Sequence, residues 1–159
     1  MKRIFSIILI LLLSIPLIAK DVKVYRGSSQ SSNDILYTIH NSKVYRGDSI
    51  KAEDVIFTVS GNYIYIGARA DSDKIVYTAS GGVIYAGNEI NRHNIEYSFR
   101  STRIYRKDSV FGTDILANIW NDYVYYGMNK GKECAIYHFS SLVEFPMQAA
   151  IWLAYKKQY

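Results

Sequence analysis

The sequence predicts a mainly β fold: an antiparallel meander of six 20-residue β-hairpin repeats, in an open or curled sheet, with one C-terminal capping helix. Three observations lead to this prediction. The chain repeats every 20 residues between residues 22 and 141 without an insertion. Two residues with turn character separate consecutive apolar runs. After residue 141 the 20-residue pattern stops and an apolar stripe with helical spacing begins. The predicted domains are therefore residues 22–141 and the C-terminal segment 142–159.

Residues 1–19 are predicted to be a signal peptide. Lys2 and Arg3 precede an apolar run from Ile4 to Ala19, which is shorter than the roughly 20 apolar residues of a membrane-spanning helix. We expect cleavage after Ala19, and a retained anchor is the alternative. After cleavage no stable membrane span is expected, and the expected location is periplasmic or secreted.

The formal charge of the chain is mildly basic. Removal of residues 1–19, which hold two basic side chains and no acids, lowers the net charge from +5 to +3. No Lys/Arg block resembles a nucleic-acid-binding stripe, so nucleic acid is not an expected partner.

The repeat is visible in six blocks, 22–41, 42–61, 62–81, 82–101, 102–121 and 122–141. Glycine follows two residues after the fourth position in every block except the fifth, where Lys107 replaces it. A β-branched residue precedes the fourth position in each block, and the fourth position itself is always tyrosine: Tyr25, Tyr45, Tyr65, Tyr85, Tyr105 and Tyr125. A repeat architecture follows.

Each block holds two predicted strands, such as Lys43 to Arg46 and Val55 to Val59. Only two residues, such as Ser60 and Gly61, separate the second strand of one block from the first strand of the next. Glycine or asparagine there suits the positive φ of a two-residue hairpin turn. This favours an antiparallel meander over a coil of parallel strands, because two residues hardly cross the about 10 Å between facing sheets.

The turns predict the register, and alternation along each strand then predicts two faces. The expected pairs are Val59–Asn62, Phe57–Ile64, Val55–Ile66, Val44–Phe57 and Arg46–Val55. The core face is predicted to carry Val44 and Ile64 together with three rows. These rows are Ile35, Val55, Ile75, Ile95, Ile115 and Ala135; Tyr37, Phe57, Tyr77, Tyr97, Ala117 and Tyr137; and Ile39, Val59, Ala79, Phe99, Ile119 and Phe139. The opposite face is predicted to carry the six tyrosines, the row Lys23, Lys43, Tyr63, Val83, Arg103 and Tyr123, the row Thr38, Thr58, Thr78, Ser98, Asn118 and His138, and the apolar residues Leu36, Ile56, Val76, Leu116 and Ile136.

The last element is a helix predicted from Pro146 to Lys157. Met147, Ile151 and Tyr155 recur every four residues and form an apolar stripe. We expect this helix to cap the sheet. Twelve strands can stay open, curl into a roll or close on themselves, and we expect the open or curled form. A homodimer is one arrangement that would cover the core face.

Two motifs resemble a family of uncharacterised exported bacterial repeat proteins. They are VYRGDS at Val44–Ser49 and NDILYT at Asn33–Thr38, the second recurring in part as DILA. Those proteins also end in an aromatic-rich helix like EFPMQAAIWLAY here, and the resemblance implies no activity. Hairpin length alone is similar to MORN repeats and to choline- and glucan-binding repeats. The chain lacks their glycine-spaced YEG pattern and paired tryptophans, so no choline pocket is implied.

The candidate ligand-binding residues are the six repeated tyrosines together with Lys43 and Arg103. Aligned aromatic rings beside cations can stack on sugar rings and leave phenol oxygens to form hydrogen bonds. The alternative is that the tyrosines form cross-strand packing ladders.

No catalytic, metal-binding or cofactor-binding set is predicted. The three histidines, His40, His93 and His138, fall at different repeat positions. Cys134, the only cysteine, is placed in a strand and expected to be a buried inert thiol, with a reactive or intermolecular thiol as the alternative.

We therefore expect a non-enzymatic exported protein that acts as an interaction or structural module of the bacterial envelope, with an unknown protein or an envelope glycan as its partner. The alternatives are a glycan or cell-wall binding protein that uses the tyrosine row, and an inhibitor of a secreted enzyme that uses loops of the 48–53 type.

Overall fold

The computed structural model describes residues 21–158, so the predicted signal peptide lies outside the described residues. These residues form twelve strands, six short 3-10 turns and one α-helix. The strands are β1 (Val22–Arg26), β2 (Ile35–His40), β3 (Lys43–Arg46), β4 (Val55–Ser60), β5 (Tyr63–Ile66), β6 (Ile75–Ser80), β7 (Val83–Ala86), β8 (Ile95–Arg100), β9 (Arg103–Arg106), β10 (Ile115–Trp120), β11 (Tyr123–Tyr126) and β12 (Ala135–Phe139), and the helix is α1 (Met147–Gln158). The predicted antiparallel meander and C-terminal helix are confirmed.

The short turns lie one residue later than predicted. The turn between β4 and β5 consists of Gly61 and Asn62, because Ser60 still belongs to β4 and pairs with Tyr63. The pairs are therefore Val59–Ile64 and Phe57–Ile66, two positions from the predicted ones. A two-residue displacement leaves each side chain on its predicted face.

A β-bulge at the end of each longer connection changes part of the predicted register. Val44 pairs with Phe57 as predicted, but Tyr45, not Arg46, pairs with Val55, and Ile56 is the extra residue. The other five long connections have the same irregularity. The predicted faces of two rows are consequently wrong. The row that packs against the core is Leu36, Ile56, Val76, Leu116 and Ile136, not the row beginning with Ile35.

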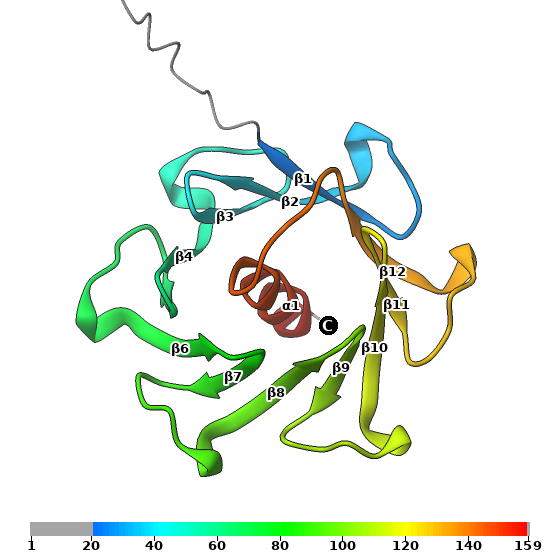
Figure 1. The fold of residues 1–159 in the computed structure, drawn as a ribbon. Helices are drawn as coiled ribbons and strands as arrows, with labels where there is room; N and C mark the ends of the chain where they lie inside the picture. The colour runs from blue at the N-terminus through cyan, green and yellow to red at the C-terminus, as the bar shows by residue number, and fades with distance from the viewer. Residues whose placement is uncertain (1–20, 159) are drawn as a thin grey trace, which may run out of the picture.

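The sheet closes, and the prediction of an open or curled sheet is wrong. The first strand, β1, pairs antiparallel with the last strand, β12, through Val24–Phe139 and Tyr25–His138, so the twelve strands form a closed barrel. Bulges bend and twist the strands that carry them, and closure leaves no strand edge without a partner. Figure 1 shows the six hairpins arranged as a ring around the helix.

The helix α1 lies inside this ring, whereas we expected it to cap an open or curled sheet (Figure 1). Ala149, Ala150, Ile151, Trp152, Leu153 and Ala154 are all buried, so the helix is buried around its whole circumference and not along one stripe. It packs against the fully buried row Val24, Val44, Ile64, Ile84, Ile104 and Val124. The helix thus covers the core face within one chain. Among residues 21–158, no helix has the length and apolar character needed to cross a membrane.

One repeat makes room for a large side chain of the helix. At the inward position that Phe57 occupies in the second block, every block has an aromatic residue except the fifth, which has Ala117. The indole of Trp152 packs edge to face on Tyr97, from the block before, at 5.8 Å between ring centroids. It also stacks on Tyr155, which contacts Tyr137 from the block after. Trp152 therefore occupies the sector that Ala117 leaves open.

Candidate functional site

The six repeated tyrosines point away from the barrel axis, yet most of their surface is buried. Tyr45, Tyr65, Tyr105 and Tyr125 are 6 to 8% exposed, and only Tyr25 and Tyr85 are half-buried. Lys43 is half-buried and Arg103 is exposed. The burial favours the packing alternative for four of the six rings. A binding role for the row stays a prediction.

A row of polar side chains beside these tyrosines fastens each long loop. Thr38, Thr58, Thr78 and Ser98 donate hydrogen bonds of 2.7 to 2.9 Å to backbone carbonyls nine residues later. For Thr58 the acceptor is the carbonyl of Gly67, the glycine that follows the repeated tyrosine. The tyrosine, threonine and glycine positions of the repeat thus serve the fold.

His138 occupies the repeat position of Thr58 in the last block. It lies where β12 pairs with β1 and closes the barrel, which we call the seam. Its Nδ1 lies 3.0 Å from the carbonyl oxygen of Gly27, which can only accept, so Nδ1 carries the proton. The imidazole stacks between Tyr25 and Tyr123, with centroid distances of 5.2 and 4.6 Å. A cleft of about 380 Å³ opens beside this stack and is also lined by Gln30 and Asp122. Aromatic faces beside an amide and a carboxylate suit a sugar ring.

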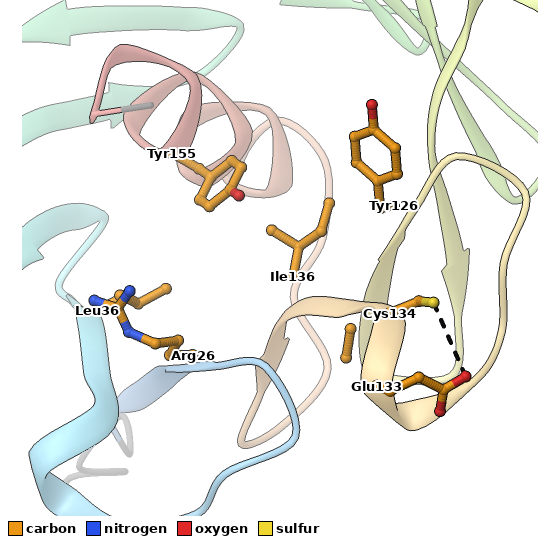
Figure 2. Close-up of a pocket in the computed structure, with 8 residues that line it drawn as sticks. Arg26, Leu36, Tyr126, Glu133, Cys134, Ile136 and Tyr155 are labelled. Carbon is orange, nitrogen blue, oxygen red and sulfur yellow. Dashed lines mark hydrogen bonds between the residues drawn. The ribbon is translucent and has the colours of Figure 1, made fainter.

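Three adjoining clefts lie between α1 and the barrel wall, and we call them together the mouth groove. The first, of about 320 Å³, is lined by Arg26, Leu36, Tyr126, Glu133, Cys134, Ala135, Ile136 and Tyr155 (Figure 2). The second, of about 370 Å³, shares Tyr126, Ile136 and Tyr155 and adds Arg106, Ile115, Leu116, Trp152 and Lys156. The third, of about 290 Å³, shares Arg106, Leu116 and Lys156 and adds Glu96, Tyr97 and Lys107. The shared residues show that the three clefts are neighbours along the end of α1.

The mouth groove carries more positive than negative charge. Arg26, Arg106, Lys107 and Lys156 line it, against Glu96 and Glu133. Burial, and then the charge of Glu96, raise the pKa of Tyr97, and Arg106 partly offsets this increase. The groove therefore offers cations beside neutral phenols and apolar walls.

Trp152 lines the second cleft with a buried donor. The residue is 2% exposed, and its indole Nε1 has no hydrogen-bond partner among the described residues. Buried tryptophan N–H groups usually have a partner, and an unmade hydrogen bond costs about 1–3 kcal/mol. This N–H is buried beneath the surface, so the indole contributes its ring to the cleft wall.

Sequence reasoning missed the mouth groove, because its walls meet only when the ring has closed around α1. A signal was present: the position after the repeated tyrosine varies, as Arg26, Arg46, Ile66, Ala86, Arg106 and Tyr126. Arg46 pairs with Tyr37, which belongs to the inward aromatic row. Because directly paired residues lie on the same face of a sheet, the position after the repeated tyrosine faces inward as well.

The predicted surroundings of Cys134 are wrong. It ends the 3-10 turn Lys132–Cys134 before β12, and it is half-buried at the groove, next to Glu133. Cys134 takes the repeat position of Asp54, which likewise ends a 3-10 turn just before a strand, so β12 begins at Ala135. In residues 21–158 no group of three His, Cys, Asp or Glu side chains could hold a metal ion.

The tips of the long loops expose large apolar side chains. Ile50, Ile90, Val110 and Phe111 are 57 to 70% exposed. Such side chains could meet a protein partner. The inhibitor alternative, which relies on these loops, stays a prediction.

Comparison with known proteins gives one family. A family model described as a 6-fold beta flower protein matches residues 24–152. The matched residues run from β1 to the middle of α1 and include all six hairpins. No curated protein and no solved structure matches the chain.

Proposed function

This chain belongs to the 6-fold beta flower protein family, and from its closed six-hairpin frame we propose that it is a non-catalytic binding module of the bacterial envelope, periplasmic or secreted. The single observation that carries the proposal is the mouth groove, which brings Arg26, Arg106 and Lys156 together with tyrosines and apolar walls. Charged groups beside aromatic and apolar surface are typical of binding sites.

The way in which the groove departs from the repeat supports this proposal. Positions that recur in every block, such as Val44 and Tyr45, build the core and the strand contacts. The variable position holds Arg106 at the groove, and two residues interrupt the pattern: Lys107 also lines the groove, and Ala117 creates the space for Trp152 beside it. A specific ligand needs an asymmetric site, and the interruptions provide one on an otherwise six-fold frame.

The residue types in the groove suit binding better than catalysis. Catalysis needs a nucleophile or an acid–base pair within hydrogen-bond reach of each other. Here the thiol of Cys134 donates a long hydrogen bond of 4.0 Å to the carboxylate of the adjacent Glu133, and none of the three histidines, the usual partners of a nucleophilic thiol, lines any of the three clefts. The proposal therefore assigns the groove to recognition.

A pull-down with matched variants tests the proposal. The purified protein is incubated with separated cell-wall and membrane fractions, beside a groove double variant, Arg106→Gln with Tyr126→Ala, and a control variant, Lys74→Gln in an exposed loop. Both groove side chains are exposed, so their loss should leave the circular dichroism spectrum unchanged. We expect one fraction to retain the wild type and the control but not the groove variant. Equal retention of all three proteins would contradict the proposal.

A second candidate function, carbohydrate binding by part of the tyrosine row, is favoured by the seam cleft. There Tyr25 is half-buried and shares a stack with His138 and Tyr123 beside a cleft of about 380 Å³. Tyr25→Ala with Tyr123→Ala should abolish retention by envelope glycan. The pair Tyr65→Ala with Tyr85→Ala, away from the seam, is the matched control. If only the Tyr65→Ala and Tyr85→Ala variant lost retention by the glycan, sugar binding would lie elsewhere on the tyrosine row.

A further inference from the structure

The second cleft of the mouth groove is the part whose positive charge is least balanced. Arg106 and Lys156 line it and no acidic side chain does, whereas Glu133 and Glu96 line the clefts on its two sides. The negative end of a helix dipole is equivalent to about half an elementary charge, which is less than Arg106 and Lys156 carry together. The surplus favours an anionic group in this cleft.

The indole ring of Trp152 belongs to the wall of the same cleft. The Nζ atom of Lys156 lies 5.9 Å from the centroid of the Trp152 ring, so the ammonium and the indole are neighbours. Trp152 cannot turn away easily, because Tyr97 and Tyr155 pack on its ring. A group bound beside Lys156 would therefore lie close to the indole.

The remaining walls indicate what carries the anionic group. Leu116 and Ile136 provide apolar surface, and Tyr126 and Tyr155 provide aromatic rings with hydroxyl groups. A cleft of about 370 Å³ lies within the usual range for small-ligand sites. A ligand the size of a single ring, with both apolar surface and hydroxyl groups, fits these walls.

We infer that this cleft is an oxyanion site: Arg106 and Lys156 bind a carboxylate or phosphate group, and Tyr126 and Tyr155 contact the ring that carries the group, close to the indole of Trp152. The inference rests on the proposed function and specifies the ligand class of the mouth groove. The oxyanion comes from a free sugar acid or sugar phosphate, or from a repeating unit of an anionic polymer.

Tryptophan spectroscopy tests the inference directly. The chain has only two tryptophans, so Trp120→Phe leaves Trp152 as the sole reporter. The probes are glucose, glucuronate and glucose 6-phosphate, which share a ring and differ in charge, and polygalacturonate as a polymeric carboxylate. Fluorescence and the NMR resonance of the indole N–H are followed during titration. We expect both acidic sugars to shift the indole resonance in a saturable way and glucose to leave it in place.

Charge variants in the Trp120→Phe background test the roles of the two cations. Arg106→Gln and Lys156→Gln should each weaken binding by about tenfold or more, because each removes a charge-assisted hydrogen bond. Both residues are exposed, so the fold should persist, and Lys74→Gln is the matched control without effect. A polymer that binds more than tenfold tighter than glucuronate would identify the polymer as the source, and equal affinity would identify the free acid.

Two results would overturn the inference: no movement of the Trp152 resonance with any acidic probe, or saturable movement that Arg106→Gln with Lys156→Gln leaves unchanged. Its failure is distinguishable from failure of the proposed function. If the groove variant still loses envelope retention while no oxyanion moves Trp152, the binding module stands and the ligand class is wrong. If oxyanions bind but retention does not depend on the groove, the site stands and the envelope role is wrong.

Discussion

The indole ring of Trp152 meets the ring of Tyr97 edge to face, with their centroids 5.8 Å apart, in the sector of the barrel where the repeat places Ala117. This relationship couples the helix to one particular repeat. The six-fold ring alone would accept the helix in several rotations, and the small residue selects one of them.

The first prediction is compensation between these positions. Trp152→Ala should destabilise the protein by about 3–5 kcal/mol, because it removes a buried indole that packs on Tyr97 and Tyr155. Ala117→Tyr should cost about 1–3 kcal/mol through overpacking. The double variant should recover part of the loss, since the new ring fills the space of the indole. Urea denaturation of the four proteins measures the coupling, and strictly additive effects would show that the two side chains do not share one space.

A second prediction concerns the two glycines of one turn. Gly82 has φ +78°, and a Cβ atom there would lie 2.7 Å from the carbonyl oxygen of Phe99, whereas a Cβ atom on Gly81, with φ +58°, would meet nothing within 4 Å. Gly81→Ala should cost about 1–2 kcal/mol through backbone strain alone. Gly82→Ala should cost more, because the Phe99 backbone must also shift. Thermal unfolding compares the two variants, and equal melting temperatures would argue against this close approach.

A third prediction is that one natural residue destabilises its loop. Lys107 adopts φ +53° at the position where the other five blocks have glycine with φ between +57° and +77°. Lys107→Gly should therefore stabilise the protein by about 0.5–1 kcal/mol. Lys107→Ala, which removes the charge but retains a side chain, is the control and should give no such gain. An equal gain from both changes would attribute the effect to charge.

The fourth prediction tests the loop-fastening hydrogen bonds. Thr58 is 8% exposed and its hydroxyl donates to the carbonyl of Gly67 at 2.7 Å. Thr58→Val keeps the shape but leaves the carbonyl without this donor, at a cost of about 1–3 kcal/mol. Thr113→Val, in an exposed loop, should change little. Hydrogen exchange should show faster opening of the loop after Gly67 in the first variant, and unchanged protection would contradict the role of Thr58.

The fifth prediction is a loss of stability at alkaline pH. Burial, followed by the neighbouring Tyr37 and Tyr155, raises the pKa of Tyr137 far above its ordinary value of 10.0. The folded state therefore holds the phenol proton more tightly than the unfolded state does. Stability from this group is complete below pH 10 and falls as the pH rises above it. Tyr137→Phe should move the alkaline unfolding midpoint to higher pH, whereas Tyr63→Phe, at an exposed ring, should not. The ultraviolet absorbance of tyrosinate and circular dichroism measure both midpoints.

Much of the fold follows from two short-range features of the sequence, the alternation of side chains along a strand and the residues of the tight turns. Alternation placed Val44, Phe57 and Val59 on the core face, and the structure confirms all three there. The turn between β4 and β5 was misplaced by one residue without consequence for the faces, because the pairing moved by an even number of positions.

The bulges could not be predicted from the same rules. Ile35 and Leu36 are adjacent, and both are apolar residues suited to a strand, so side-chain type does not decide which one faces inward. The backbone decides: Val24 pairs with Tyr37 and Tyr25 with Ile35, so Leu36 is the extra residue. Only the pairing across the long loop between β1 and β2 fixes this choice.

Closure and the mouth groove depend on distant contacts. The pairing of Tyr25 with His138 results from the accumulated bend of six hairpins, and no single repeat encodes it. Arg26 and Arg106 come to one groove only after closure, so neither residue stood out in the sequence. The break in the repeat at Ala117 was visible, but its partner Trp152 lies in a segment without repeats.

The position of α1 has a consequence for folding. The segment that fills the interior follows all twelve strands, and its first residue lies 125 positions beyond the start of β1. Without Met147–Gln158, the inward valines and isoleucines of the strands would line an empty apolar lumen. Removal of this one helix should therefore dismantle the whole ring.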